Sequence, residues 1–289
     1  IAWLEQPTHQ LVCFTDPDYP ALLRSVSGCP ILLYVAGAAQ RLADPQLAIV
    51  GSRNPTGAGT DNAFAFAQHL ALSGLTITSG LAEGIDAAAH RGALAAPGTT
   101  IAVLGTGLDL IYPRMHEELA QQIQERGVLV SEFPLGTPGR AANFPQRNRI
   151  IAGLARGTLV VEAALQSGSL ITARQAAEAG REVFAIPGSI HSPQSKGCHA
   201  LIKQGAKLVE SAADILEDLA GVRPKAVSAG APEGDPLLEA LGHDPVTLDA
   251  LQARTGWPAA ELNARLLELE LDGRVARLPG GLFQRRTSA

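Results

Sequence analysis

Between residues 44 and 220, short apolar runs alternate with longer stretches in which apolar residues recur at helical spacing. The apolar runs have strand length and are almost continuously hydrophobic, which is typical of strands buried on both faces of a sheet. The predicted strands are residues 47–50, 75–78, 100–104, 128–130, 159–161 and 183–186. The predicted helices are residues 61–72, 85–95, 116–126, 148–154 and 170–179. This order predicts an α/β fold, Rossmann-like, with a mostly parallel sheet and helices on both faces.

The flanking segments have different patterns. Residues 1–43 contain a predicted strand at 31–35 and are expected to pack on the core as a leader. Residues 221–234 are rich in Gly, Pro and small residues, as in a linker. In residues 235–289, two short helices, a longer helix beginning at Pro258 and a hairpin around a Pro-Gly-Gly turn follow one another, which is the order of a winged helix.

Composition limits the partners and the compartment. The net charge of −5 over 289 residues argues against wrapping duplex DNA, so any nucleic-acid contact is expected to be a local basic patch. No apolar run approaches the roughly 18 residues of a membrane span, and no stretch reads as a signal peptide. The three cysteines lack metal-ligand spacing and suit a reducing cytoplasm. Because the chain begins at Ile1, we expect it to be a fragment with an upstream segment missing.

One segment has an unusual local charge. From Phe133 to Val161 there is no acidic residue, whereas four arginines occur, and Phe144, Arg147 and Arg149 lie close together in the run F-P-Q-R-N-R. An aromatic ring beside arginines suits single-stranded nucleic acid, because bases stack on the ring and the cations follow the phosphates. A loop with a buried Phe and solvated arginines is an equally open interpretation.

Glycine-bearing loops follow most of the predicted strands. They are Gly51-Ser52-Arg53, Ser79-Gly80, Gly105-Thr106-Gly107, Ser167-Gly168-Ser169 and Pro187-Gly188-Ser189, with Lys196 and Lys203 just beyond the last. In an open parallel sheet, ligands bind outside the carboxyl ends of the strands, where such loops can hold phosphates. The loops therefore favour a ligand with several phosphates, although each could be only a tight turn.

Carboxylates and histidines leave a catalytic alternative open. Glu132 and Glu162 lie at the ends of predicted strands, where an acid or base could act. A glutamate in the position of Glu162 more often forms hydrogen bonds with neighbouring backbone groups than acts on a substrate. Asp86 and His90 share a predicted helix face, and such a pair more often orients a side chain than binds metal or catalyses. No catalytic or metal residue is assigned.

Several motifs together resemble the DNA-processing protein DprA (Smf) family over roughly residues 15 to 220. They are G-S-R (51–53), S-G-L-A-x-G-I-D-x-x-A-H (79–90), G-T-G-L-D-x-x-Y-P (105–113), S-E-x-P (131–134), F-P-x-R-N-R-I-I-A-G-L (144–154), V-E-A-x-x-x-S-G-S-L-I-T-A (161–173) and P-G (187–188). The tail resembles the family's winged-helix extension.

The resemblance implies a non-catalytic cytoplasmic protein that binds incoming single-stranded DNA during natural transformation, protects it and loads the recombinase RecA onto it. It implies a dimerising, extended Rossmann fold without a nucleotide cofactor, and an N-terminal helical domain upstream. By motif, the implied DNA contacts are Arg53 and Phe144. The expected binding site also includes Gly51, Ser52, Ser79, Gly80, Arg147, Arg149, Lys196 and Lys203.

Two other functions stay open. A nucleotide-processing N-glycoside hydrolase of the lysine-decarboxylase-like group has a similar sheet, but its P-G-G-x-G-T-x-x-E motif is absent. A pure protein adaptor is the third possibility. The predicted recognition helix of the tail is acidic, with Glu261, Glu268, Glu270 and Asp272 against Arg265, so we expect the winged helix to contact protein, or DNA only through wing residues Arg274, Arg277, Arg285 and Arg286.

Overall fold

The computed structural model describes residues 2–219, 236–242, 245–258, 262–263, 265–266, 269–270, 274–278 and 282–285. The chain forms two compact units, residues 1–227 and 228–289, which are described separately. The predicted linker at 221–234 and the tail residues Glu261, Glu268, Asp272 and Arg286 lie outside the described residues. No helix in the described part of the chain is both long and apolar enough to cross a membrane.

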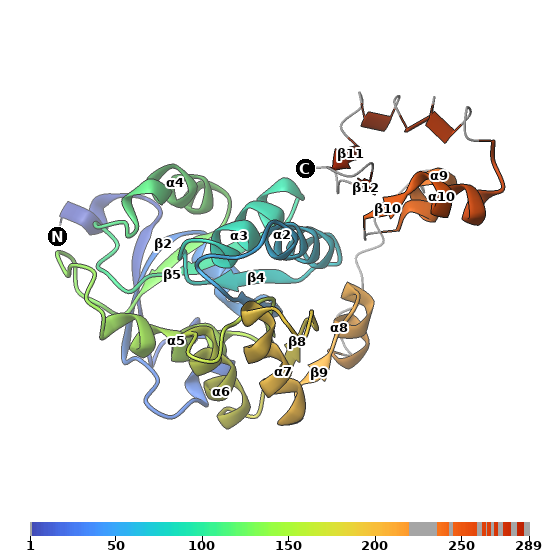
Figure 1. Cartoon of the computed structure of the whole chain (residues 1–289). Helices are drawn as coiled ribbons and strands as arrows, with labels where there is room; N and C mark the ends of the chain where they lie inside the picture. The colour runs from blue at the N-terminus through green and yellow to red at the C-terminus, as the bar shows by residue number, and fades with distance from the viewer. Residues whose placement is uncertain are drawn as a thin grey trace. The chain divides into compact units, whose positions relative to one another are not determined.

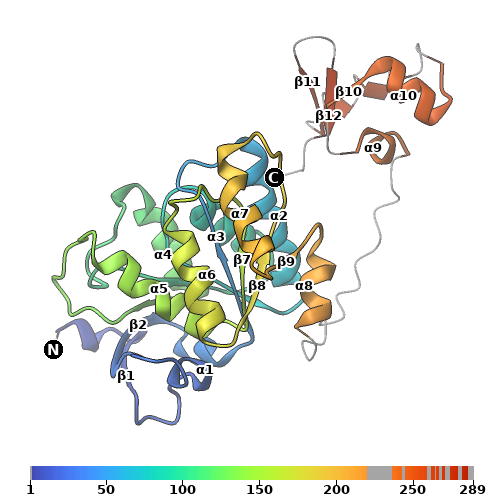
Figure 2. The ribbon, with the colours of Figure 1, turned by 60° about the horizontal axis from the view of Figure 1, so that its bottom comes forward.

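A nine-stranded sheet organises the first unit, in the order β1-β2-β6-β5-β4-β3-β7-β8-β9. The strands from β6 to β9 in this order are parallel, whereas β2 is antiparallel to both β1 and β6. The bounds are β1 (His9–Cys13), β2 (Leu32–Gly37), β3 (Gln46–Val50), β4 (Thr76–Ser79), β5 (Thr100–Val103), β6 (Val128–Ser131), β7 (Gly157–Val160), β8 (Glu182–Ala185) and β9 (Lys207–Leu208). The mostly parallel sheet confirms the predicted fold class, and Figure 2 shows β1 and β2 at one end of it and β9 at the other.

Helices cover both faces of this sheet (Figure 1). Alternate residues of β3 point to opposite cores: Leu47 and Ile49 pack with α2 and α3, whereas Ala48 and Val50 pack with α5 and α6. This period-2 alternation within a wholly apolar strand is what a sheet covered on both faces requires. The helices are α1 (Ala21–Arg24), α2 (Gly57–Leu72), α3 (Ile85–Ala95), α4 (Glu117–Arg126), α5 (Asn143–Leu154), α6 (Ser169–Glu178), α7 (Lys196–Lys203) and α8 (Ala212–Asp218), with short 3₁₀ helices at Ala2–Glu5, Ala39–Ala43, Arg114–His116 and Pro193–Ser195.

The start of α5 differs from the prediction. The sequence pattern predicts a helix from residue 148, but α5 begins at Asn143, so Phe144 and Arg147 stand on a helix rather than in a loop. The Asn143 side chain donates a hydrogen bond to the Gly105 carbonyl (3.0 Å), which fixes this end of the helix to the neighbouring loop. Pro145 is tolerated because the first turn of a helix leaves its N–H groups unpaired. The apolar run alone did not reveal this polar first turn.

The second unit contains α9 (Pro236–Leu241), β10 (Val246–Thr247), α10 (Leu248–Thr255) and the antiparallel pair β11 (Val275–Leu278) and β12 (Leu282–Arg285). The side chain of Thr247 accepts a hydrogen bond from the Ala250 N–H (3.2 Å) and so caps α10. A separate apolar core, which includes Leu237, Leu251 and Phe283, holds these elements together.

Candidate binding groove

A groove with a volume of about 700 Å³ opens at the carboxyl ends of β3 and β7. The chain continues from β3 to its neighbour β4 on one side, and from β7 to its neighbour β8 on the other. The adjacent strands β3 and β7 therefore form the topological switch point of the sheet, which is where open α/β folds bind ligands. The loop 51–54, the first turns of α5 and the Ser167–Thr172 start of α6 line the groove.

The loop after β3 presents an exposed cation beside free backbone donors. Arg53 is exposed, and the N–H groups of Ser52 and Arg53 have no hydrogen-bond partner among the described residues. The Ser52 hydroxyl accepts the Asn54 N–H (3.1 Å) and closes the turn. A side chain at Gly51 would come within 2.7 Å of Ile85 and 2.9 Å of the Glu162 carbonyl, so only glycine fits here. The loop can approach an anion closely and clamp it with Arg53.

An aromatic pair stands next to this loop. The Arg53 guanidinium carbon lies 5.6 Å from the centre of the Phe144 ring, within the range of a cation–π contact. Tyr112 lies in the loop that follows β5 and also lines the groove. Its ring centre is 5.3 Å from that of Phe144. Sequence reasoning placed Arg53 and Phe144 in the site, and the structure brings them together. It missed Tyr112, for which the signal was the Tyr-Pro pair that ends the G-T-G-L-D loop.

The loop after β4 is filled by the protein itself. The buried carboxylate of Asp86 accepts hydrogen bonds from the N–H groups of Gly80 (3.0 Å) and Ala82 (3.4 Å). The Ser79 hydroxyl donates to the Ile49 carbonyl (2.6 Å), and both Ser79 and Gly80 are buried. The phosphate nest expected at Ser79 and Gly80 is therefore occupied by an internal carboxylate, and the structure gives these two residues internal partners instead.

Arg147 also has an internal role. Only 4% of it is exposed, and its Nη1 donates to the carbonyls of Gly80 and Val103. Burial lowers the pKa of Arg147 to about 10, with the Asp86 charge opposing this shift, and burial raises the pKa of the Asp86 carboxyl. At neutral pH the arginine stays protonated, so it holds the Ser79–Gly80 loop in place while only part of it faces the groove.

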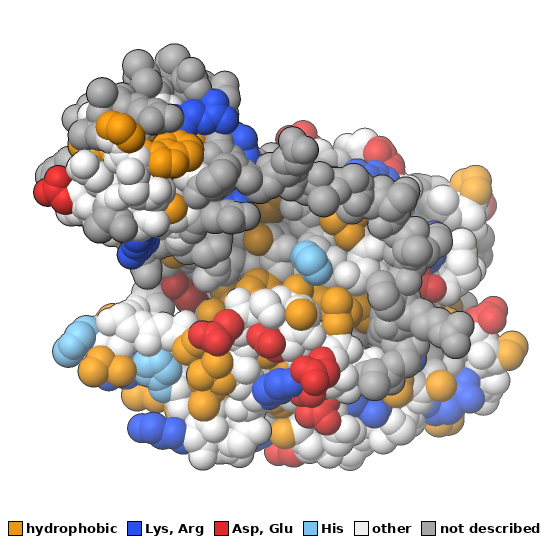
Figure 3. Space-filling view, turned by 90° about the vertical axis from the view of Figure 1, so that its right-hand side faces the viewer, with side chains coloured by type: hydrophobic (Ala, Val, Ile, Leu, Met, Phe, Trp, Pro, Cys, Tyr) orange, Lys and Arg blue, Asp and Glu red, His pale blue; other side chains and the backbone are white. Residues whose placement is uncertain are grey.

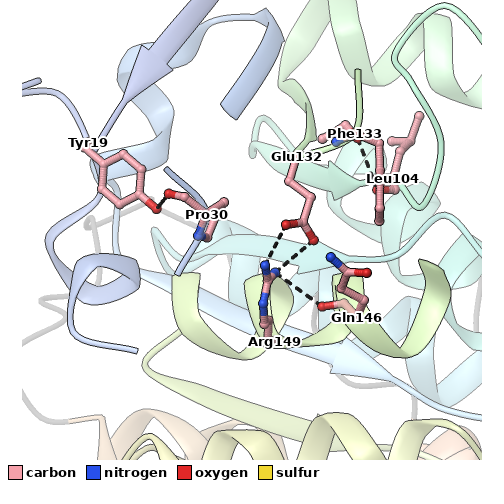
Figure 4. Close-up of polar contacts among 8 residues, drawn as sticks. Tyr19, Pro30, Leu104, Glu132, Phe133, Gln146 and Arg149 are labelled. Atoms are coloured by element: carbon pink, nitrogen blue, oxygen red, sulfur yellow. Dashed lines mark hydrogen bonds and ion pairs between the residues drawn. The ribbon is translucent and has the colours of Figure 1, made fainter. Parts of the chain in front are cut away.

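The remaining predicted cations lie elsewhere. Arg149 forms a bidentate ion pair with Glu132, with N–O distances of 2.9 and 2.6 Å. It also donates a hydrogen bond to the Gln146 carbonyl (Figure 4). Lys196 and Lys203 are exposed at the first and last residues of α7, and neither lines the groove. The structure therefore gathers Gly51, Ser52, Arg53 and Phe144, and separates Arg149, Lys196 and Lys203 from them.

The candidate acid–base groups are engaged by the protein. Glu162 accepts from the Thr56 N–H (2.9 Å) and hydroxyl (2.6 Å), as its expected backbone-bonding role requires. The Nδ1 of buried His90 contacts the Thr100 hydroxyl (2.7 Å), and that hydroxyl donates to the Ile77 carbonyl. His90 is thus a neutral Nδ1–H donor. Among the described residues, no three His, Cys, Asp or Glu side chains form a group that could hold a metal.

One face of the first unit carries a mixture of described side chains rather than a basic patch. On the side that faces the viewer in Figure 3, described acidic, basic and hydrophobic side chains of the first unit are intermixed. Elsewhere in the first unit, Lys207 forms an ion pair with Asp218 (2.7 Å). A mixed surface carries little net attraction for a polyanion, because each positive charge is offset by a nearby carboxylate.

Comparisons with known proteins agree on one family. Residues 10–220 match the family model for DNA recombination-mediator protein A, and residues 222–281 match the model of the DprA winged helix domain. Protein Smf of Escherichia coli is 47% identical over 300 residues, covering 99% of this chain and 80% of that protein. Among solved structures, DNA processing protein A of Streptococcus pneumoniae aligns with a TM-score of 0.71 at 45% identity, over 73% of this chain and 75% of that one. The protein of the same name from Helicobacter pylori gives 0.66 at 28%, over 73% and 95%.

Proposed function

The chain belongs to the DNA recombination-mediator protein A family, and from this premise we propose that it binds single-stranded DNA in the groove at β3 and β7. The observation that carries the proposal is the exposed Arg53 guanidinium beside the Phe144 ring, above a glycine turn with free N–H groups. These are the two components of single-strand recognition, a cation for the phosphates and a ring for the bases. The Helicobacter pylori relative has a single-stranded DNA binding mode, which supports the same ligand here.

The proposed ligand is a single strand rather than a duplex. An unpaired base can turn out of the strand and stack on a ring, whereas the bases of a duplex are already stacked on one another. The groove also offers one exposed arginine, while Arg147 and Arg149 are held by internal partners. A chain of net charge −5 with so local a cationic site is poorly suited to a long duplex.

The wider role follows the family. We propose that the protein protects incoming DNA during natural transformation and loads RecA onto it, acting in the cytoplasm as a homodimer. We also propose that it acts by binding and not by catalysis. This is supported by the internal partners of Glu162, Asp86 and Glu132, which leave these carboxylates poorly placed to act on a ligand in the groove.

A titration of a labelled single-stranded oligonucleotide tests the DNA proposal, with fluorescence anisotropy as the readout and unlabelled duplex as competitor. Arg53→Ala should weaken binding at least about tenfold, because a charged hydrogen bond contributes about 1.5–3 kcal/mol. Arg174→Ala is the matched control, since Arg174 is exposed on α6 and does not line the groove. The proposal would be contradicted if unlabelled duplex displaced the labelled strand as effectively as unlabelled single strand does. Equal losses of affinity in Arg53→Ala and Arg174→Ala would also contradict it.

A further inference from the structure

We propose that Tyr112 is a second base-stacking ring of the groove, so that the site holds two bases rather than one. The inference rests on the proposed single-stranded DNA ligand and extends its site to a residue outside the glycine loop and the F-P-x-R-N-R segment. It starts from the position of Tyr112, which lines the groove together with Phe144 and is 50% exposed.

Of the two rings, Tyr112 is the more open. Phe144 is only partly exposed, because Gly105 packs against one edge of its ring and Arg53 lies over it. A Cβ at Gly105 would come within 2.8 Å of Phe144 Cδ1, so this contact is close. Half of Tyr112, in contrast, faces solvent next to the groove. Tyr112 has neighbours in Gly139 and Phe144, but a base that stacks on its solvent-exposed part displaces water.

The loop that carries Tyr112 is braced on both sides. The Thr106 hydroxyl donates to the Leu110 carbonyl (2.6 Å), and the Asp109 carboxylate accepts the Gly136 N–H (2.8 Å). Beyond the tyrosine, His116 is buried and its Nδ1 lies 2.9 Å from the Leu81 carbonyl. A ring held by such a loop is in place before the ligand arrives, so little conformational entropy is lost on binding.

The orientation of the pair suits successive bases. The two ring planes are inclined by 36°, and their centres are 5.3 Å apart. Bases stacked on separate, inclined rings cannot remain stacked on each other, so the strand must open between them. The Tyr112 hydroxyl has no hydrogen-bond partner among the described residues, so it could also bond a ligand, and Tyr112→Phe separates its contribution from that of the ring.

The test compares two probes, a labelled dT12 and a labelled 12-mer of abasic sites, which keeps the phosphates and lacks the bases. The full chain is titrated as wild type, Tyr112→Ala, Tyr112→Phe and Tyr112→Leu, with Met115→Ala as control. Met115 is 73% exposed near the same loop and does not line the groove. Leucine preserves apolar bulk beside Gly139 and Phe144 but has no aromatic face.

We expect Tyr112→Ala and Tyr112→Leu to bind dT12 about tenfold more weakly, while Tyr112→Phe and Met115→Ala stay within about twofold. Affinity for the abasic 12-mer should be the same in all five proteins, because it reports phosphate contacts alone. A Tyr112→Leu protein that keeps the wild-type preference for dT12 would overturn the inference. Failure of the wild type to bind either probe would instead remove the proposed function, and the role of Tyr112 with it.

Discussion

The two loops that follow β3 and β4 share a glycine turn but differ in what their backbone N–H groups bond. Both follow buried parallel strands, contain glycine and precede a helix, and both lie near an arginine. At residues 51–53 the N–H groups are free and Arg53 is exposed. At Ser79–Gly80 the Asp86 carboxylate fills the turn, and Arg147 is buried against the Gly80 carbonyl.

The difference is made by a single acidic residue on the following helix. Asp86 stands in the first turn of α3 and reaches back to the N–H groups of Gly80 and Ala82. The carboxylate at the start of α2 is Glu162, which bonds Thr56 and leaves the N–H groups of Ser52 and Arg53 without a partner among the described residues. A carboxylate within a glycine turn occupies the position that a bound phosphate would take. A glycine turn is therefore available to an external anion only where the protein does not supply its own.

The largest effect should come from removing the buried arginine. Arg147→Met leaves the Asp86 charge buried without its cation and two carbonyls without a donor, so we expect the free energy of unfolding to fall by about 3–5 kcal/mol. Arg53→Met should change it by less than about 0.5 kcal/mol, because Arg53 is exposed. Urea denaturation of both variants makes the comparison. Equal stabilities would show that the two loops do not differ in the way described.

The exposed arginine should dominate the ionic part of binding. We expect Arg53→Ala to reduce the slope of log K against log salt concentration by about one, since it removes one phosphate contact. Arg53→Lys should keep the slope but bind more weakly than wild type, because lysine lacks the planar fork and its stacking on Phe144. Titrations at several salt concentrations measure both. An unchanged slope in Arg53→Ala would mean that Arg53 touches no phosphate.

Another buried polar group on α3, the helix that follows the second loop, is His90. Its Nε2 is buried without a partner and burial lowers its pKa to about 3. Between pH 3 and 6.5 the unfolded chain therefore binds more protons at this residue than the folded chain does, and stability falls as the pH falls below 6.5. The slope should reach about 1.4 kcal/mol per pH unit.

Substitution isolates this contribution from that of other groups. His90→Gln should lose less stability than wild type between pH 7 and pH 5, whereas His69→Gln, at an exposed position, should behave as wild type. Denaturation curves at the two pH values give the difference. A wild-type pH dependence in His90→Gln would show that His90 is not held neutral by its surroundings.

The smallest effect is expected from the tail. Residues 1–227 and 228–289 form separate compact units, and the second has its own apolar core. If the groove of the first unit binds the strand, deletion of residues 235–289 should change affinity for single-stranded DNA by less than about twofold, that is, about 0.4 kcal/mol. A large loss would show that the winged helix contacts DNA, for example through Arg274 and Arg285.

The sequence predicted the sheet better than it predicted the role of each arginine. Apolar runs identified the six strands from β3 to β8, because strands buried on both faces contain few charged residues. Arg53, Arg147 and Arg149 look alike in sequence, and burial and partners separate them only in the fold. The spacing of residues did indicate that Arg147 is buried. It lies three, four and seven residues before Ile150, Ile151 and Leu154, which places it on the buried face of α5.

Other features depend on contacts between distant residues. Two short elements near the end of the first unit, α7 and β9, lack a clear sequence pattern because each spans few residues. The bond from Asn143 to Gly105 that extends α5, and the approach of Tyr112 to Phe144, join segments more than 30 residues apart. No local pattern reports such pairs.

Photo-crosslinking tests the central claim most directly. An oligonucleotide that carries 5-iododeoxyuridine would be irradiated with the full chain, and the crosslinked peptides identified by mass spectrometry. The account predicts crosslinks at Phe144 and Tyr112, the rings that line the groove. Crosslinks confined to residues 236–285, or to faces of the first unit away from β3 and β7, would contradict it.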